Sequence, residues 1–404
     1  MITNLLPNHA TSIYREMTGA VEERIFHFDL KEWLRGMYQN ALEAEFEVFM
    51  ELAPYERSLE RRTQRNGFYE RSLDTVYGAL EGLRVPRDRR GLFRTTVFKR
   101  HQRREAALDR LITECFWRGI STRDMKKILK QLSGVEVSSS TVSRLTEKWQ
   151  KEVFQWHQRR ISDDYVYLFL DGVWIKNRSL GEKRRLILVA FGIKADGTKE
   201  VIDYMLSVTE KEEHWAKFLQ HLSYRGLEGK NLKLIVTDGC HGLWNAVDLV
   251  FPGISQQTCW AHKIRNILGN VKKSDQPEVH KLLKPLFSKK TDSRAKAEKV
   301  VNKWKKTWRK KYPEAVRSLE AAEDRLINYF DCPLEHHSMI RTTNHIERVF
   351  KEFRRRMRPM EITPNAKSAD RILYALVQIR NEKLIELKKY QDRRLGRIMA
   401  FTQK

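Results

Sequence analysis

Two aspartates occupy matching positions in the sequence. Asp171 follows the apolar run YVYLFL, Asp238 follows LKLIVT, and glycine comes directly after each. A carboxylate at the carboxyl end of a buried strand lies where open α/β sheets build their sites, although Asp-Gly alone is also ordinary turn chemistry. If the two strands are neighbours, the carboxylates converge, and Mg²⁺ is a hard cation that prefers such oxygens. The matched pair therefore favours a metal site.

A third carboxylate would complete a two-metal centre, and Glu347 is the best candidate. It lies in the first turn of an amphipathic helix, where the pattern N-x-x-E also resembles a capping box in which glutamate reaches back to a backbone amide. Glu352 faces a different side of that helix, and Asp163 and Asp164 precede their strand rather than end it. The sequence pattern alone places Glu347 only slightly ahead.

Several side chains close to these acids in the sequence could bind a metal, a phosphate or a substrate. Cys259-x-x-His262 has the spacing of half a zinc site, but no second pair at a suitable distance is evident, although Cys240-His241 lies near in sequence. Arg354 lies two turns after Glu347 on the same side of the helix, within reach of a bound phosphate. Four residues flank the aspartates and either pack in the core or position a substrate: Trp174, His241, Trp244 and Asn245.

The elements that must position these residues form a mixed α/β pattern. Val, Ile, Leu and aromatic residues predict strands over 165–172, 184–197, 198–208 and 232–239. Helices are predicted over 212–222 and 243–250. This order suggests a mixed sheet whose first and fourth strands lie side by side.

No strand signal returns in the last part of the chain. Residues 272–311 carry fifteen Lys or Arg against four acids and are predicted to be a helical insertion. Helical periodicity then covers 342–357 and 368–387.

The N-terminal part has a strongly basic block. Residues 84–104 contain nine Arg or Lys and one acid, interleaved with aromatic residues. Such a block is either a solvated surface or a contact to the DNA backbone. The candidate contacts are Arg84, Arg87, Arg89 and Arg90.

Residues 116–155 have the pattern of a helix-turn-helix, although a plain helical hairpin has the same period. Ser121 and Ser138 are candidate helix caps, and Gly134 suits a left-handed turn between the helices. The predicted buried side chains are Met125, Ile128, Leu129, Leu132, Val142, Leu145 and Trp149. The outward face of the second helix offers donors for phosphates and base edges, namely Ser140, Thr141 and Arg144.

Composition narrows the class of protein. The 404 residues include 77 Lys plus Arg and 52 Asp plus Glu, a formal charge of +25, which favours a polyanion partner, with nucleic acid ahead of a membrane surface. A hydrophobic fraction of 41% excludes global disorder. No apolar run approaches the roughly 20 residues of a membrane span, and no secretory signal is visible, so we expect a soluble, cytoplasmic protein. The four cysteines are too sparse for a disulfide framework.

The chain resembles bacterial insertion-sequence transposases of the Mutator-type superfamily, whose core is RNase H-like and carries a DDE carboxylate triad. The matching motifs are YLFLDGVWIK, LIVTDGCHGLWNAV, TCWAHKIRNIL and TTNHIERVFKEFRRRMRP, together with RNGFYERSLDT, VPRDRRGLF and GISTRDMKKIL. They occur in the right order from about residue 30 to about residue 390. The 109 positions between Asp238 and Glu347 accommodate the insertion that this superfamily carries.

The resemblance implies Asp171, Asp238 and Glu347 as catalytic metal ligands, with Asp171 bridging two Mg²⁺ ions that Mn²⁺ can replace. Cys259 and His262 would support the active centre. The substrates would be double-stranded terminal inverted repeats and target DNA, bound by a homodimer or larger assembly near the nucleoid. The implied regions are a mostly helical N-terminal DNA-binding or dimerisation region at 1–115, the helix-turn-helix at 116–155, core segments at 160–268 and 337–404, and an all-helical insertion at 269–336.

The residues themselves leave two alternative functions open. One is a non-enzymatic DNA-binding protein derived from a transposase, although all three carboxylates are intact in their motifs. The other is a repair-type nuclease of the same fold, which has no need of an N-terminal region for recognising DNA ends.

Overall fold

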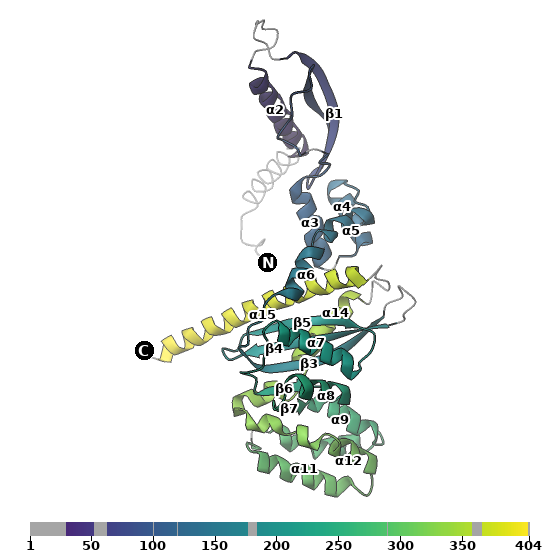
Figure 1. Ribbon diagram of the computed structural model, residues 1–404, viewed down its shortest axis with the longest axis vertical. Helices are drawn as coiled ribbons and strands as arrows, with labels where there is room; N and C mark the ends of the chain where they lie inside the picture. The colour runs from purple at the N-terminus through teal and green to yellow at the C-terminus, as the bar shows by residue number, and fades with distance from the viewer. Residues whose placement is uncertain are drawn as a thin grey trace, which may run out of the picture. The chain divides into compact units, whose positions relative to one another are not determined.

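The protein consists of two compact units, residues 1–147 and 148–404 (Figure 1). The computed structural model describes residues 30–51, 63–99, 101–118, 120–176, 184–288, 290–357 and 366–402. The first 29 residues of the predicted N-terminal region lie outside these ranges. Within them, no helix is long and apolar enough to span a bilayer.

The N-terminal unit begins with a helix packed on a β-hairpin. Its elements are α2 (Leu30–Met50), β1 (Arg65–Thr75) and β2 (Gly78–Asp88). The two strands are antiparallel, and Gly78 has φ 132°, a conformation that favours glycine at the tight turn. Leu42 of α2 is buried with Leu73, Leu80 and Leu83 of the hairpin, so one small core holds the helix against the strands.

Three short helices complete this unit: α3 (Ala106–Trp117), α4 (Thr122–Ser133) and α5 (Ser139–Glu147). The predicted caps form, since Ser121 accepts a hydrogen bond from the Asp124 N–H (3.1 Å) and Gly134 adopts φ 68°. The shared core contains Leu108, Ile112, Met125, Leu129, Val142 and Leu145.

For two residues, the prediction that they lie in this core is wrong. Leu132 is 78% exposed, because it lies in the last turn of α4 just before the chain turns away at Gly134. Trp149 lies beyond the end of α5, is only half-buried and belongs to the second unit.

The second unit is built on a five-stranded mixed sheet with strand order β5-β4-β3-β6-β7. Its strands are β3 (Tyr165–Lys176), β4 (Arg184–Lys194), β5 (Lys199–Ser207), β6 (Leu234–Thr237) and β7 (Gln256–Thr258). β3 is antiparallel to β4, as β4 is to β5, whereas β3, β6 and β7 run parallel. The first and fourth strands therefore lie side by side, as predicted.

Two strand predictions need correction. β3 does not end at residue 172 but continues to Lys176, because β4 pairs with it along its whole length. β7 was not predicted, because it consists of Gln256, Gln257 and Thr258, three buried polar residues without an apolar pattern.

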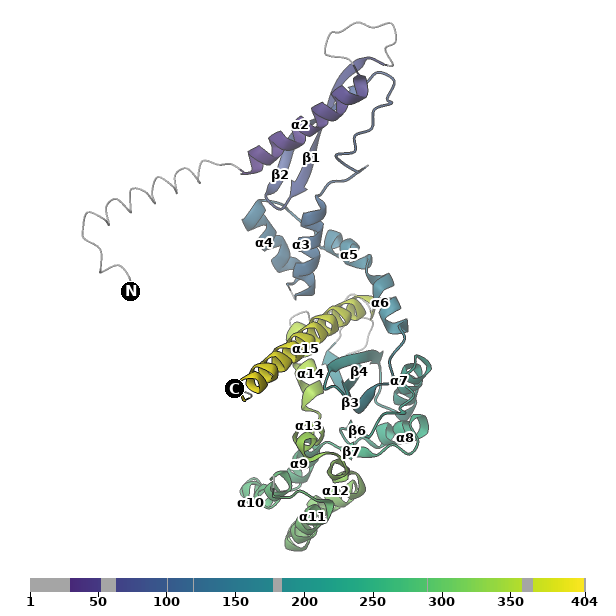
Figure 2. The same ribbon diagram turned by 90° about the vertical axis from the view of Figure 1, so that its left-hand side faces the viewer.

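Helices cover both faces of the sheet (Figure 2). α7 (Glu212–Tyr224) and α8 (His241–Val250) pack on one face around buried residues such as Leu168, Leu170 and Trp215. α14 (Asn344–Met357) and α15 (Ala366–Thr402) pack on the other, where His345 contacts the rings of Phe169 and Phe191. α6 (Gln150–Gln158) precedes the sheet in the chain.

The segment between β7 and α14 is helical, and it includes residues 272–311, for which helices without strands were predicted. It contains α9 (Trp260–Gly269), α10 (Gln276–Lys281), α11 (Arg294–Trp308), α12 (Pro313–Glu320) and α13 (His337–Ile340), with four short 3₁₀ turns between α10 and α13. This helical segment lies beyond the β7 edge of the sheet (Figure 1). The indole N–H of Trp260 donates to the carbonyl of Leu326 (2.7 Å) and thereby ties α9 to the turns before α13.

Candidate active site

Asp171 lies inside the longest strand of the sheet and points toward α14. Alternation along β3 places it on the same face as Phe169, which contacts His345 of α14. Its side chain is buried (4% exposed), and Oδ1 accepts the Gly172 N–H (2.8 Å). The other oxygen, Oδ2, makes no hydrogen bond with any described residue. A buried carboxylate oxygen without a partner is costly unless a ligand or ion completes it.

Asp238 comes directly after β6 and therefore beside Asp171. Leu170 and Thr237 are the last pair of the β3–β6 ladder, so each aspartate follows that pair by one residue. Asp238 accepts the Cys240 N–H (3.0 Å). Burial, and then the negative charge of Asp238, raise the pKa of Asp171 well above its usual range. The convergence expected for neighbouring strands is thus present.

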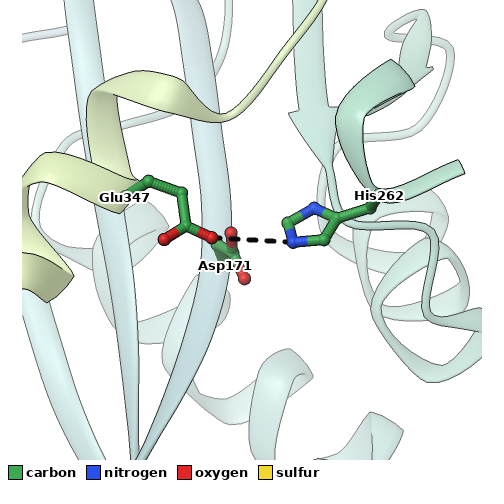
Figure 3. A group of neighbouring side chains, drawn as sticks. All are labelled: Asp171, His262 and Glu347. Carbon is green, nitrogen blue, oxygen red and sulfur yellow. Dashed lines mark ion pairs between the residues drawn. The ribbon is translucent and has the colours of Figure 1, made fainter. Parts of the chain in front are cut away.

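Glu347 reaches the same place from α14. Its carboxylate, a ring nitrogen of His262 and an oxygen of Asp171 all lie within 4.8 Å of one another (Figure 3). Glu347 Oε1 is 3.6 Å from His262 Nε2, and Oε2 is 3.7 Å from Arg354 Nη1. Between the described residues Glu347 and Asn344, the capping-box hydrogen bond is not formed. The carboxylate faces the aspartate instead of its own helix end.

Cys259 holds the segment before α14 against the start of α9. Its buried sulfur accepts hydrogen bonds from the backbone N–H (3.3 Å) and the hydroxyl (3.4 Å) of Thr343. Its own N–H donates to Thr237 at the end of β6 (2.7 Å), and the Trp260 N–H donates to Arg341 (3.0 Å). These bonds tie the strand that precedes Asp238 to the helix that carries Glu347.

His262 provides positive charge among the acids. The nearby Cys259 sulfur raises the pKa of His262 to about 9 against the opposing effect of burial, and Asp171 adds to the increase, although no well-formed hydrogen bond joins the ring to the sulfur. Burial alone would raise the pKa of the Cys259 thiol, but His262 and Thr343 outweigh it and lower that pKa. The imidazolium therefore offsets part of the repulsion between the carboxylates.

The alternative acids have other partners. Glu352 accepts from Arg355 (2.9 Å) on the far side of α14. Asp163 accepts the N–H groups of Gly229 and Lys230, and Asp164 accepts the Ser162 hydroxyl. Each of these carboxylates accepts hydrogen bonds elsewhere and does not belong to the cluster of Asp171, His262 and Glu347.

The flanking residues divide between core and surface. Trp244 is buried, and its indole donates to Thr237 (3.1 Å), so it belongs to the core. His241 is exposed and packs against Trp244, while Asn245 donates to Glu212 (2.8 Å). Trp174 is 44% exposed.

Two residues near the site were missed by sequence reasoning. Thr343 is a hydroxyl residue directly before a helix, a signal that could have marked it as structural. Glu210 precedes α7, and one of its oxygens lies 3.1 Å from where a side chain on Gly172 would begin. Burial and the charge of Asp238 raise the pKa of Glu210. Glu210 lies on the sheet face opposite Asp171, and no sequence pattern predicts this position.

The predicted DNA contacts lie mostly on the surface. Arg84 is 3.8 Å from Glu70, Arg87 donates to the Phe68 carbonyl (3.3 Å), and Arg89 donates to Gln64 (3.1 Å). The remaining members are the exposed Arg90, Ser140 and Arg144 and the half-buried Thr141 and Arg354.

Comparison with known proteins places this arrangement in a family. Residues 17–386, which include every residue of the site, match the family described as transposase, Mutator family. The chain belongs to the Mutator family of transposases. It is 34% identical over 391 residues to the transposase for insertion sequence element IS256 in transposon Tn4001 of Staphylococcus aureus, covering 95% of this chain and 98% of the relative.

The chain is also similar to a transposase from a second bacterium. The chain is 33% identical to the transposase for insertion sequence element ISRM5 of Rhizobium meliloti, over 89% of this chain and 90% of the relative. Among solved structures, it matches the Drosophila P element transposase strand transfer complex with 14% identity, covering 75% of this chain and 82% of the other, at a TM-score of 0.29. A TM-score of that size does not establish a shared fold.

Proposed function

We propose that this Mutator-family protein cleaves and rejoins DNA strands at the terminal inverted repeats of its insertion sequence. The observation that carries this proposal is the meeting of Asp171, Glu347 and His262 beside Asp238, which follows the end of β6. The strand order β5-β4-β3-β6-β7, with two antiparallel strands on one side and two parallel strands on the other, supports an RNase H-like core.

The residues present fit divalent cations. Asp171 Oδ2 is a buried, unpartnered carboxylate oxygen, and carboxylates are the ligands that Mg²⁺ and Mn²⁺ prefer. Asp171, Asp238 and Glu347 would hold the ions. Divalent ions so bound would activate the attacking water or 3′-hydroxyl and neutralise charge on the leaving oxygen.

The protein's own residues position the reacting groups. Thr343 and Cys259 fix the start of α14, so Glu347 meets Asp171 without a large rearrangement. Arg354 lies next to Glu347 and would contact a phosphate drawn into the site. His262 would balance carboxylate charge before the ions bind and contact the DNA afterwards. No covalent link to protein is required, because the 3′-hydroxyl released by cleavage can attack the second strand.

The N-terminal unit would recognise the DNA ends. α4 and α5 would act as the helix-turn-helix, with Ser140, Thr141 and Arg144 directed toward base edges and phosphates. The arginines of the basic block, Arg84, Arg87, Arg89 and Arg90, would contact the backbone. Since two ends must be brought together, the active form would be at least a homodimer, working on the nucleoid in the cytoplasm.

The test is strand nicking of an end-labelled terminal-repeat duplex in Mg²⁺ or Mn²⁺. Wild type should nick the duplex, Glu347→Gln should not, and Glu352→Gln, changed five residues away in the same helix, should retain nicking. Nicking by the Glu347 variant would move the third ligand elsewhere. Binding without nicking by wild type would favour the non-enzymatic DNA-binding protein.

A further inference from the structure

A basic groove lies along the hairpin of the N-terminal unit. It encloses about 970 Å³ between the β1–β2 hairpin and the segment that follows β2. Its lining includes five permanent cations, Arg71, Arg87, Arg94, Lys99 and Arg103. The lining also contains two acids, Asp74 and Asp88, so the groove carries a net positive charge.

The segment that forms the outer wall is fixed at both ends. At its start, the buried carboxylate of Asp88 accepts the N–H groups of Arg90 (3.1 Å) and Phe93 (2.9 Å). At its end, the Asp74 N–H donates to the Arg103 carbonyl (2.9 Å), and the Glu105 N–H donates to the Asp74 carbonyl (2.8 Å). Hydrogen bonds at both ends therefore hold the outer wall of the groove in position.

The floor of the groove is arranged before any ligand arrives. The guanidinium of Arg71 lies 4.3 Å from the ring centre of the buried Phe98 and donates to the Gln102 carbonyl. That of Arg87 lies 5.8 Å from the ring centre of Tyr69. Arginines held on aromatic rings lose little side-chain entropy when they bind an anion.

Three cations of the outer wall are exposed and have no acidic partner. Arg94, Lys99 and Arg103 form neither an ion pair nor a side-chain hydrogen bond with any residue that the structure describes. They are distributed along ten residues of chain. A row of unpaired cations beside a groove suits an extended polyanion better than a small ligand, which prefers a mostly apolar pocket.

Two polar side chains of the lining, Gln102 and Thr95, are already hydrogen-bonded within the protein. Gln102 accepts the Lys99 N–H (3.0 Å) and donates to the Arg104 carbonyl (2.9 Å). The Thr95 hydroxyl donates to Glu45. Exposed cations distributed along a groove suit contacts to successive phosphates, and phosphate contacts carry no direct sequence information.

We propose that this groove binds the phosphodiester backbone of duplex DNA irrespective of sequence, next to the bases read elsewhere in the unit. This inference rests on the proposed function, since it needs DNA as the partner. The groove would contribute to the affinity for DNA and to the register of the protein on the duplex, and other residues would determine sequence preference.

The test is the salt dependence of binding to two duplexes, one carrying the terminal repeat and one with its sequence scrambled. The full-length variant Arg94→Gln, Lys99→Gln, Arg103→Gln should lower the slope of log affinity against log salt by about 2.7, at about 0.9 for each phosphate contact. Between 50 and 200 mM salt, the ratio of wild-type to variant affinity should then change about 40-fold, equally for both duplexes. Each single substitution should lower the slope by about 0.9.

The matched control removes three cations of the same unit that already have acidic partners. These are Arg35 with Glu32 (2.8 Å), Arg118 with Glu114 (2.7 Å) and Lys130 with Glu136 (2.6 Å). Their triple change to Gln should alter the slope by less than about 1. Equal slopes for both triple variants, or a loss confined to the terminal-repeat duplex, would overturn the groove proposal while wild-type nicking still supported the proposed function. Failure of wild type to bind either duplex would overturn both.

Discussion

Replacing Asp171 by Asn should stabilise the protein while abolishing its chemistry. The carboxylate is buried, one oxygen has no partner among the described residues, and Asp238 lies beside it. Asn has nearly the same shape and carries no charge. Removing one unsatisfied buried charge should increase the free energy of unfolding by about 1–3 kcal/mol. For a unit of this size, that corresponds to a rise in melting temperature of roughly 2–12 °C.

The direction of the pKa shift also predicts how the stability difference between variant and wild type changes with pH. Because folding raises the pKa of Asp171, the carboxyl group contributes stability in its protonated form, and this contribution is lost as pH rises through the folded-state pKa. Asn behaves like the protonated form at every pH. The difference in melting temperature between variant and wild type should therefore widen from pH 5 to pH 8 in the absence of divalent ions.

The assay is thermal unfolding with and without Mg²⁺. An ion at 100 times its dissociation constant should stabilise wild type by about 2.7 kcal/mol and the variant by much less. The control is Asp196→Asn, since hydrogen bonds from Thr198 lower the pKa of that exposed carboxylate and its loss should not stabilise the protein. A lower melting temperature for Asp171→Asn at pH 8, or equal Mg²⁺ responses, would refute the reasoning. Nicking should disappear in the variant while end binding stays within a few-fold of wild type.

Three further perturbations test the supporting structure. Thr343→Val removes the hydroxyl donor to Cys259; it should cost about 1 kcal/mol of stability and slow nicking in a single-turnover assay, and an unchanged rate would argue against a positioning role. Burial lowers the pKa of His157, but hydrogen bonds to Asp203 and Asp370 outweigh it and raise the pKa to about 9. The resulting stability, on the order of 3 kcal/mol, should be complete below pH 6.5 and lost as pH rises through about 9, and urea unfolding of His157→Gln should lack this loss. Leu129→Ala in the core of α3, α4 and α5 should cost about 2–5 kcal/mol, measured by urea unfolding of the N-terminal unit; a cost below 1 kcal/mol would mean that this core is loosely packed.

Local patterns were sufficient for most elements and for the paired aspartates. β-prone runs predicted four of the five strands in the sheet of the second unit, because those four strands are apolar, whereas β7 consists of buried polar residues. Helix caps at Ser121 and Gly134 followed from residue type, because capping depends on neighbours in sequence. Leu132 was wrongly predicted to be buried, because helical periodicity does not show which turn of a helix is the last to contact the core.

The amino-acid sequence by itself determined the mixed α/β pattern, the position of Asp171 and Asp238 after apolar runs, and the basic character of the chain. These features depend on residue type and short spacing. Only the tertiary structure decided that Glu347 and not Glu352 faces Asp171, that His262 joins them, and that Cys259 fixes this meeting through Thr343. Such contacts join residues up to 176 positions apart, Asp171 to Glu347, and they form only when the chain folds so that α9 and α14 meet the central strand β3.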